Sequence, residues 1–212
     1  FVVRTPDRID ADPYKQMLTS REPTKQLRRP VSLAVVDGGR TLLVANQRSG
    51  TISVVDLESE RVVGEKEIRG QPADLVVDSR EKTLYVVDRE TNALIILQRR
   101  RGALQEIGRV NVDAAPVSVL LNGDDTRVTV ASLWAHRLCE IDVSDPQNPK
   151  VVSKIDLPFS PREQRELDDG RLVVADAFGG HLGIIDVQQQ QLVAHRELHA
   201  HNMRGLGLSL DR

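Results

Sequence analysis

The chain has 212 residues and a formal net charge of -2, with acidic and basic side chains mixed along its length. This balance excludes the strongly basic surface with which proteins bind nucleic acids or anionic membranes, so we expect no nucleic-acid partner. The single cysteine, Cys139, excludes an intrachain disulfide, and no apolar run reaches the roughly 18 residues of a membrane-spanning helix.

One sequence pattern recurs from residue 27 onward. Residues 1–26 are polar, contain prolines and lack the pattern, so we expect a leader strand and a connecting loop there. Copies of the pattern begin, at spacings of 42, 44 and 45 residues, at Pro30, Pro72, Pro116 and Pro161. A fifth copy begins at Met203. Self-similarity with a period of about 40–45 residues is typical of propellers.

Each copy predicts four β-strands. In the first copy, β-rich runs span residues 32–36, 41–45, 51–56 and 62–68, and turn formers such as Gly38 and Gly39 separate them. Four antiparallel strands are the unit of a β-propeller blade. We therefore predict an all-β fold, an incomplete β-propeller of four blades and the start of a fifth. The expected blades span residues 27–70, 71–112, 113–157 and 158–200, with the next blade starting at 201–212.

The string LAVVDGGRTLLVANQRSGTISVVDL (residues 33–57) resembles the YVTN-type β-propeller repeat, and Leu84-Tyr85-Val86-Val87-Asp88 is similar to its eponymous tetrapeptide. The resemblance covers residues 30–212. It implies a propeller of commonly seven blades, so we expect the parent protein to continue beyond Arg212.

Three strings in the second half resemble a subgroup of large bacterial YVTN propeller proteins: LPFSPREQ, LVVADAFGG and HAHNMRGLGLSLD. This likeness implies an exported protein, periplasmic, at the cell surface or secreted. It also implies a di-haem cytochrome c peroxidase-like region after the propeller. The sequence has no C-x-x-C-H motif, so we expect no cofactor in this segment, and haem c only in such a further region.

Chain direction predicts which loops share a face. The segments that enter the blades at each repeat proline should lie beside the turns between the second and third strands. Ligands of propellers usually collect on such a rim, which by fold analogy favours a site there.

Four departures from the repeat fall on or near this rim. Trp134 with His136 interrupts one turn, either to pack between blades or to anchor an interface. Phe178 and His181 flank a glycine pair, either as a simple hairpin or as part of a site. Arg162 and Arg165 lie on an inner strand that is apolar in the other copies, either in an ion-pair network or holding an anion.

The fourth departure is a group of histidines near the end of the chain. His199 and His201 would face the same way on a strand, and two imidazoles could hold a transition metal. The alternative is a polar fourth strand that leads to a rim loop, with Arg204 near the channel mouth.

No catalytic motif is recognisable, and the recurring aspartates are better explained as turn formers than as acid–base groups. We therefore expect a non-catalytic scaffold that binds another protein, a fused domain or a ligand through its rim loops. One alternative is a redox protein in which the propeller accompanies a c-type cytochrome domain. Another is a lactonase-like hydrolase that uses His181, His201 and Arg204.

Overall fold

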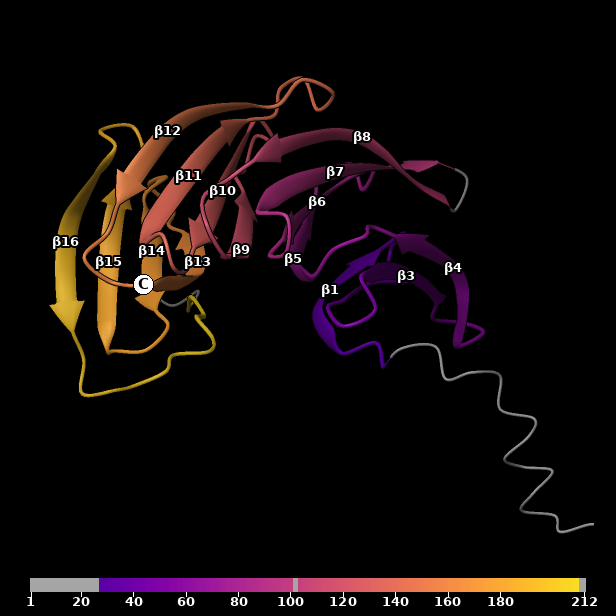
Figure 1. Ribbon diagram of the computed structural model, residues 1–212, viewed down its shortest axis with the longest axis horizontal. Helices are drawn as coiled ribbons and strands as arrows, with labels where there is room; N and C mark the ends of the chain where they lie inside the picture. The colour runs from indigo at the N-terminus through magenta and orange to yellow at the C-terminus, as the bar shows by residue number, and fades with distance from the viewer. Residues whose placement is uncertain (1–26, 101–102, 210–212) are drawn as a thin grey trace, which may run out of the picture.

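The computed structural model describes residues 27–100 and 103–209, and all regular structure in these ranges is β-strand (Figure 1). The sixteen strands are β1 (Pro30–Val36), β2 (Thr41–Asn46), β3 (Thr51–Asp56), β4 (Arg61–Glu67), β5 (Pro72–Val77), β6 (Thr83–Asp88), β7 (Ala93–Arg100), β8 (Ala103–Asn111), β9 (Pro116–Leu121), β10 (Arg127–Ser132), β11 (Arg137–Asp142), β12 (Lys150–Asp156), β13 (Pro161–Glu166), β14 (Leu172–Asp176), β15 (His181–Asp186) and β16 (Gln191–Glu197). The predicted leader strand at 1–26 lies outside the described residues.

The strands form four separate antiparallel sheets, each a meander of four consecutive strands. We call them blades 1 to 4. The first strands of neighbouring blades contact one another, β1 with β5, β5 with β9 and β9 with β13, and the four sheets follow one another along an open arc (Figure 1). The predicted incomplete β-propeller is thereby confirmed.

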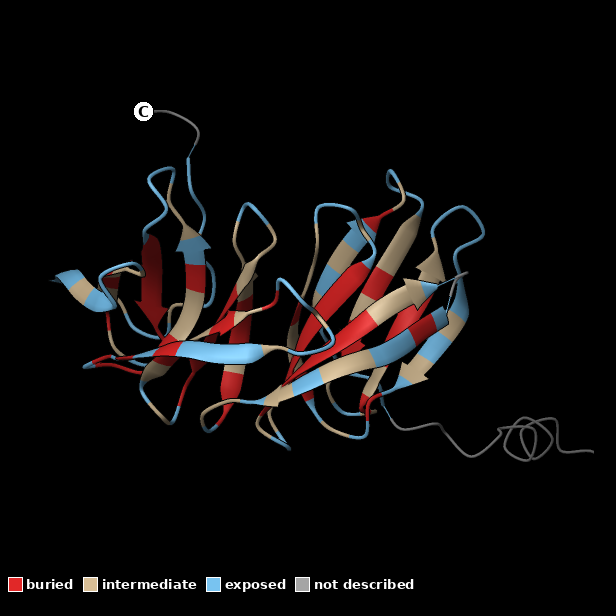
Figure 2. Ribbon diagram, turned by 90° about the horizontal axis from the view of Figure 1, so that it is seen from above, coloured by how far each residue is buried: buried red, intermediate tan, exposed pale blue. Residues whose placement is uncertain are grey.

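Apolar side chains between the blades form the core. Strand β6 is buried along its whole length, because its alternate side chains pack on two neighbours. Leu84 and Val86 belong to the cluster shared with blade 1, whereas Tyr85 and Val87 belong to the cluster shared with blade 3. Figure 2 shows buried stretches, in red, along strands of the blades. Each fully buried side chain of this size contributes roughly 1.5–3 kcal/mol.

Among the residues that the structure describes, one sheet face of blade 1 has no neighbouring blade. Leu33 and Val35 on β1 are 61% and 58% exposed. Their counterparts in blade 2, Leu75 and Val77, pack against blade 1. The difference in exposure therefore comes from position in the arc and not from residue type.

The residues expected to start a fifth blade form no strand between 201 and 209. An inner strand needs a neighbouring strand to accept and donate its backbone hydrogen bonds, and the four sheets of the described residues include none that pairs with residues 201–209. Cys139 is fully buried in β11, and burial raises the pKa of its thiol to about 11, as expected of a small core residue. Within the described ranges, no helix has the length and hydrophobicity that a membrane crossing requires.

Candidate functional site

The register of the sheets confirms which loops share a face. In blade 1, Pro30 at the start of β1 pairs with Asn46 at the end of β2. In blade 4, Pro161 likewise pairs with Asp176. The segments before the repeat prolines therefore lie beside the turns that follow β2, β6, β10 and β14. We call this end of the blades the Pro-loop face.

A buried polar residue at the end of each second strand holds the Pro-loop face together. Asp88 is fully buried, and its carboxylate accepts hydrogen bonds from the backbone of Gln71 and Glu90 and from the Thr91 hydroxyl, at 2.6, 3.1 and 2.5 Å. It thus joins the loop before β5 to the turn after β6. The Asp88 carboxylate therefore acts on the backbone of the turns, as the interpretation of the recurring aspartates as turn formers predicts.

Trp134 and Phe178 stack on each other across the boundary between blades 3 and 4. Their ring centroids lie 5.6 Å apart with 21° between the planes. Trp134 is 60% exposed and Phe178 52% exposed, so Trp134 is not packed away between the blades. Both follow the end of a second strand by two residues, after Ser132 and Asp176, where blades 1 and 2 carry Arg48 and Glu90. Asp176 accepts the Phe178 amide at 3.2 Å and so fixes this turn.

A cavity of about 530 Å³ opens on the same face. Its lining comes from blades 1, 2 and 3, and consists of Arg29, Gln47, Gln71, Arg89, Glu90, Asn92, Ala114, Ala115 and Trp134. We call it the rim cavity. The guanidinium groups of Arg29 and Arg89 form no hydrogen bond or ion pair with the residues that the structure describes. Two cations beside an exposed aromatic pair suit an anionic group attached to an apolar one.

Carboxylates line the inner strands. Asp74 on β5 accepts hydrogen bonds from the Ser32 hydroxyl of blade 1, at 2.7 Å, and from the Val119 amide of blade 3, at 3.0 Å. Burial is the main cause that raises the pKa of Asp74, and burial followed by the charge of Asp74 raises the pKa of Glu163. Arg165 opposes both shifts. Asp74 therefore links the inner strands of three blades.

On the charged inner strand β13, the polar side chain of Gln164 is fully buried and only half of its amide is paired, because Oε1 has no hydrogen-bond partner among the described residues. Gln164 is fully buried where the other blades carry Leu33, Leu75 and Val119, and its side-chain NH₂ donates to the Thr129 carbonyl at 2.8 Å. Arg165 is exposed and donates to the Gln164 carbonyl. Arg162 is half-buried, and neither arginine lines the rim cavity.

The predicted histidines separate into three places. His136 lies in the turn after β10, where its ring bonds to the Ser160 hydroxyl at 3.0 Å. His181 contacts His195, as described below. His199 and His201 follow the end of β16 at Glu197, so the strand that was expected to align them does not extend to them. Within residues 27–100 and 103–209, no three or more His, Cys, Asp or Glu side chains gather closely enough to hold a metal ion.

Arg204 is exposed and bonds to the Asn202 side chain at 3.3 Å, and it is not among the residues of the rim cavity. Of the predicted site residues, the structure thus brings Trp134 and Phe178 together beside the cavity. The repeat pattern singled out neither Arg29 nor Arg89 as a site residue. Arg29 directly precedes a repeat proline, and Arg89 directly follows a second strand. These positions beside the repeat are the sequence feature from which both residues could have been assigned to the Pro-loop face.

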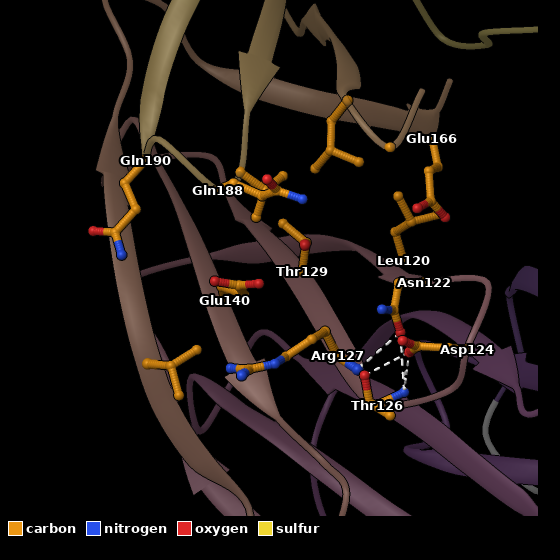
Figure 3. Close-up of a pocket in the computed structure, with 14 residues that line it drawn as sticks. Leu120, Asn122, Asp124, Thr126, Arg127, Thr129, Glu140, Glu166, Gln188 and Gln190 are labelled. Atoms are coloured by element: carbon orange, nitrogen blue, oxygen red, sulfur yellow. Dashed lines mark hydrogen bonds between the residues drawn. The ribbon is translucent and has the colours of Figure 1, made fainter. Parts of the chain in front are cut away.

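A second cavity, of about 520 Å³, opens on the opposite face between blades 3 and 4 (Figure 3). Arg127 and Glu140 line it, together with turn residues such as Asn122 and Asp124. Here Arg127 pairs with Asp142 at 3.5 Å, and Asn122 accepts two backbone amides of its own turn. Burial is the main cause that raises the pKa of Glu140. The polar groups of this cavity largely serve the local turns.

Comparison with known proteins supports the fold. No model of a known protein family matches the chain, and no curated protein sequence matches it. Among solved structures, hydrazine synthase of Kuenenia stuttgartiensis is 24% identical, with a TM-score of 0.73, over 82% of this chain and 50% of that one. The periplasmic gluconolactonase PpgL of Pseudomonas aeruginosa is 14% identical, with a TM-score of 0.72, over 87% and 58%.

The β-propeller domain of Cps50 (Swd1) from Myceliophteria thermophila is 15% identical, with a TM-score of 0.67, over 84% of this chain and 59% of that one. The chain therefore spans between half and three fifths of the length of these three structures. At such identities the likeness establishes the β-propeller fold and nothing finer, and the YVTN-type resemblance stays a prediction.

Proposed function

We propose that this chain is the propeller part of a non-catalytic scaffold that binds a protein or a ligand through the Pro-loop face. The observation that carries the proposal is the exposed Trp134–Phe178 stack beside a cavity lined by Arg29 and Arg89. Exposed aromatic side chains and arginines are the residues that most often anchor interfaces. The ligand class that fits is an anion, a carboxylate or a phosphate, next to an apolar ring or chain.

Trp134 is the only tryptophan of the chain, so its fluorescence reports on this face alone. We propose to titrate the protein with glutamate-rich peptides and with sugar acids while following its emission. The expected result is a saturable change that is lost in the Arg29→Gln/Arg89→Gln double variant. A set of anions that leaves the emission unchanged at millimolar concentration would count against the proposal.

A lactonase-like hydrolase is the second candidate, and the likeness to the periplasmic gluconolactonase favours it. The arginines of the rim cavity could hold a sugar acid. Of the residues that the sequence suggested for this chemistry, His181, His201 and Arg204, none lines that cavity. Purified protein that opens no sugar lactone, with and without divalent metal, would reject this candidate.

We also propose that this propeller belongs to an exported protein. This part of the proposal rests on the YVTN-type resemblance, and the periplasmic source of one structural neighbour supports it. A fused c-type cytochrome region belongs to the same resemblance. The coding sequence that flanks this segment tests both, because it would carry an export signal and C-x-x-C-H motifs.

A further inference from the structure

A pair of histidines lies on the outer strands of blade 4, and neither the packing of the blades nor the proposed binding face explains it. His181 begins β15, and His195 lies on β16. The Nδ1 atom of His181 and the Nε2 atom of His195 are 3.1 Å apart. Their ring centroids are 4.9 Å apart.

A β-bulge brings the two rings to the same side of the sheet. Asp186 pairs with Gln191, but after the irregularity at Ile184 and Ile185 the register shifts by one, so that Gly183 pairs with His195 and His181 with Glu197. Residues that pair across antiparallel strands project to one side, and so do residues two apart on a strand. His181, His195 and Glu197 therefore share a face.

The floor of this face holds both rings in place. Phe159 is 4% exposed, and both imidazoles stack on it, His181 with centroids 6.0 Å apart and His195 with centroids 5.7 Å apart. Gly183 makes room for this arrangement, because a Cβ atom there would lie 2.9 Å from the Phe159 ring. The rings are thus supported from below, while His195 is exposed and His181 half-buried.

The separations fit two ligands of one ion. Imidazoles bound to one ion through bonds of about 2.05 Å, at angles from about 90° (square planar) to about 109° (tetrahedral), place their nitrogens about 2.9–3.3 Å apart and their ring centres about 4.5–5.2 Å apart. A linear N–H···N hydrogen bond of the same length would set the ring centres about 5.4 Å apart. The observed 4.9 Å is close to the converging arrangement.

We propose that His181 and His195 form a two-histidine site for a borderline divalent transition metal, Zn²⁺ or Cu²⁺. Neutral imidazole is a common ligand of both ions. Glu197 keeps a negative charge on the same face, and the remaining coordination positions are open to water. The site is distinct from the His199 and His201 pair that the sequence suggested.

The experiment titrates the full chain, stripped with a chelator, with Zn²⁺ by calorimetry and with Cu²⁺ under electron paramagnetic resonance. We expect one site per chain and nitrogen couplings from two imidazoles. His181→Ala and His195→Ala should each weaken binding by about tenfold or more. The matched controls His199→Ala and His201→Ala remove exposed histidines of the same chain and should leave the affinity unchanged.

His195→Asn and circular dichroism of every variant guard against a loss that comes from unfolding. A chain that binds neither ion above the level of the His181→Ala/His195→Ala double variant would overturn the proposal. Equal losses in the His199→Ala or His201→Ala controls would also overturn it. Neither outcome bears on anion binding at the Pro-loop face, which Trp134 reports separately.

Discussion

The two faces of the arc are built from the same repeat, yet they use their polar residues differently. On the face opposite the Pro-loop face, aspartates and asparagines bond to the backbone of their own turns, as Asp56 does with Ser59 and Asn122 does with Thr126. On the Pro-loop face, Asp88 also bonds to its own turn, but it is fully buried and in addition joins that turn to the loop before β5 through the Gln71 amide. The tips of those turns are then free to vary.

That freedom is visible at one position of the repeat. Two residues after each second strand, the four blades carry Arg48, Glu90, Trp134 and Phe178. Variable side chains on a constant backbone are the usual way in which loop surfaces acquire binding specificity. The buried carboxylates therefore belong to the scaffold, whereas the exposed turn tips of the Pro-loop face are candidates for function.

The largest expected effect comes from removing a buried carboxylate. Asp88→Ala leaves the Gln71 and Glu90 amides and the Thr91 hydroxyl without their acceptor, and we expect a loss of about 2–4 kcal/mol in the free energy of unfolding. Asp56→Ala, in an exposed turn of the opposite face, should cost clearly less. Urea denaturation measures both. Equal losses would show that the two faces do not differ in this way.

An intermediate effect is expected when the aromatic stack is broken. Phe178→Ala removes a partly exposed ring contact that is worth about 0.5–1.5 kcal/mol. It should also make Trp134 easier for acrylamide to quench, because one side of the indole loses its cover. A loss as large as that of Asp88→Ala would instead place Phe178 in the scaffold.

The smallest effect concerns acid stability on the opposite face. Hydrogen bonding to Arg99 is the main cause that lowers the pKa of Asp37, and the two groups lie 2.6 Å apart. A carboxylate with a lowered pKa stabilises the fold above its unfolded pKa of about 3.9, and that contribution is lost as the pH falls through the folded value.

Asp37→Asn should therefore cost about 1 kcal/mol or less at pH 7, since this pair is partly exposed. The difference from the unchanged protein should shrink as the pH falls below the unfolded pKa of about 3.9 and through the lowered folded pKa of Asp37, where the carboxyl becomes protonated in both states. Asparagine tolerates the positive φ of 57° at this position. Chemical denaturation at several pH values checks the prediction, and a difference that does not depend on pH would contradict it.

Repetition made the blades and their faces predictable, because strand rhythm and turn residues recur in every copy. The stack of Trp134 on Phe178 was not predictable, since the two rings come from different blades. The contact of His181 with His195 was also hidden. Without the bulge after Ile184, His195 would pair with Leu182 and point to the other side of the sheet.

The burial of Gln164 is a further feature that the sequence could not predict. The side chain is polar, yet it is fully buried, and its NH₂ group donates to the Thr129 carbonyl. Such a partner, 35 residues away on another blade, is set by tertiary packing. Local sequence patterns carry no information about it.

The central claim, that the Pro-loop face is the binding face, is tested most directly by comparing arginines on the two faces. Calorimetry would measure the affinity of a glutamate-rich peptide or a sugar acid for Arg29→Gln/Arg89→Gln and for Arg127→Gln, which lines the cavity of similar volume on the opposite face. We expect the double variant to bind about tenfold or more weakly and Arg127→Gln to bind as the unchanged protein does. Weakened binding in Arg127→Gln, with the double variant unaffected, would contradict the account.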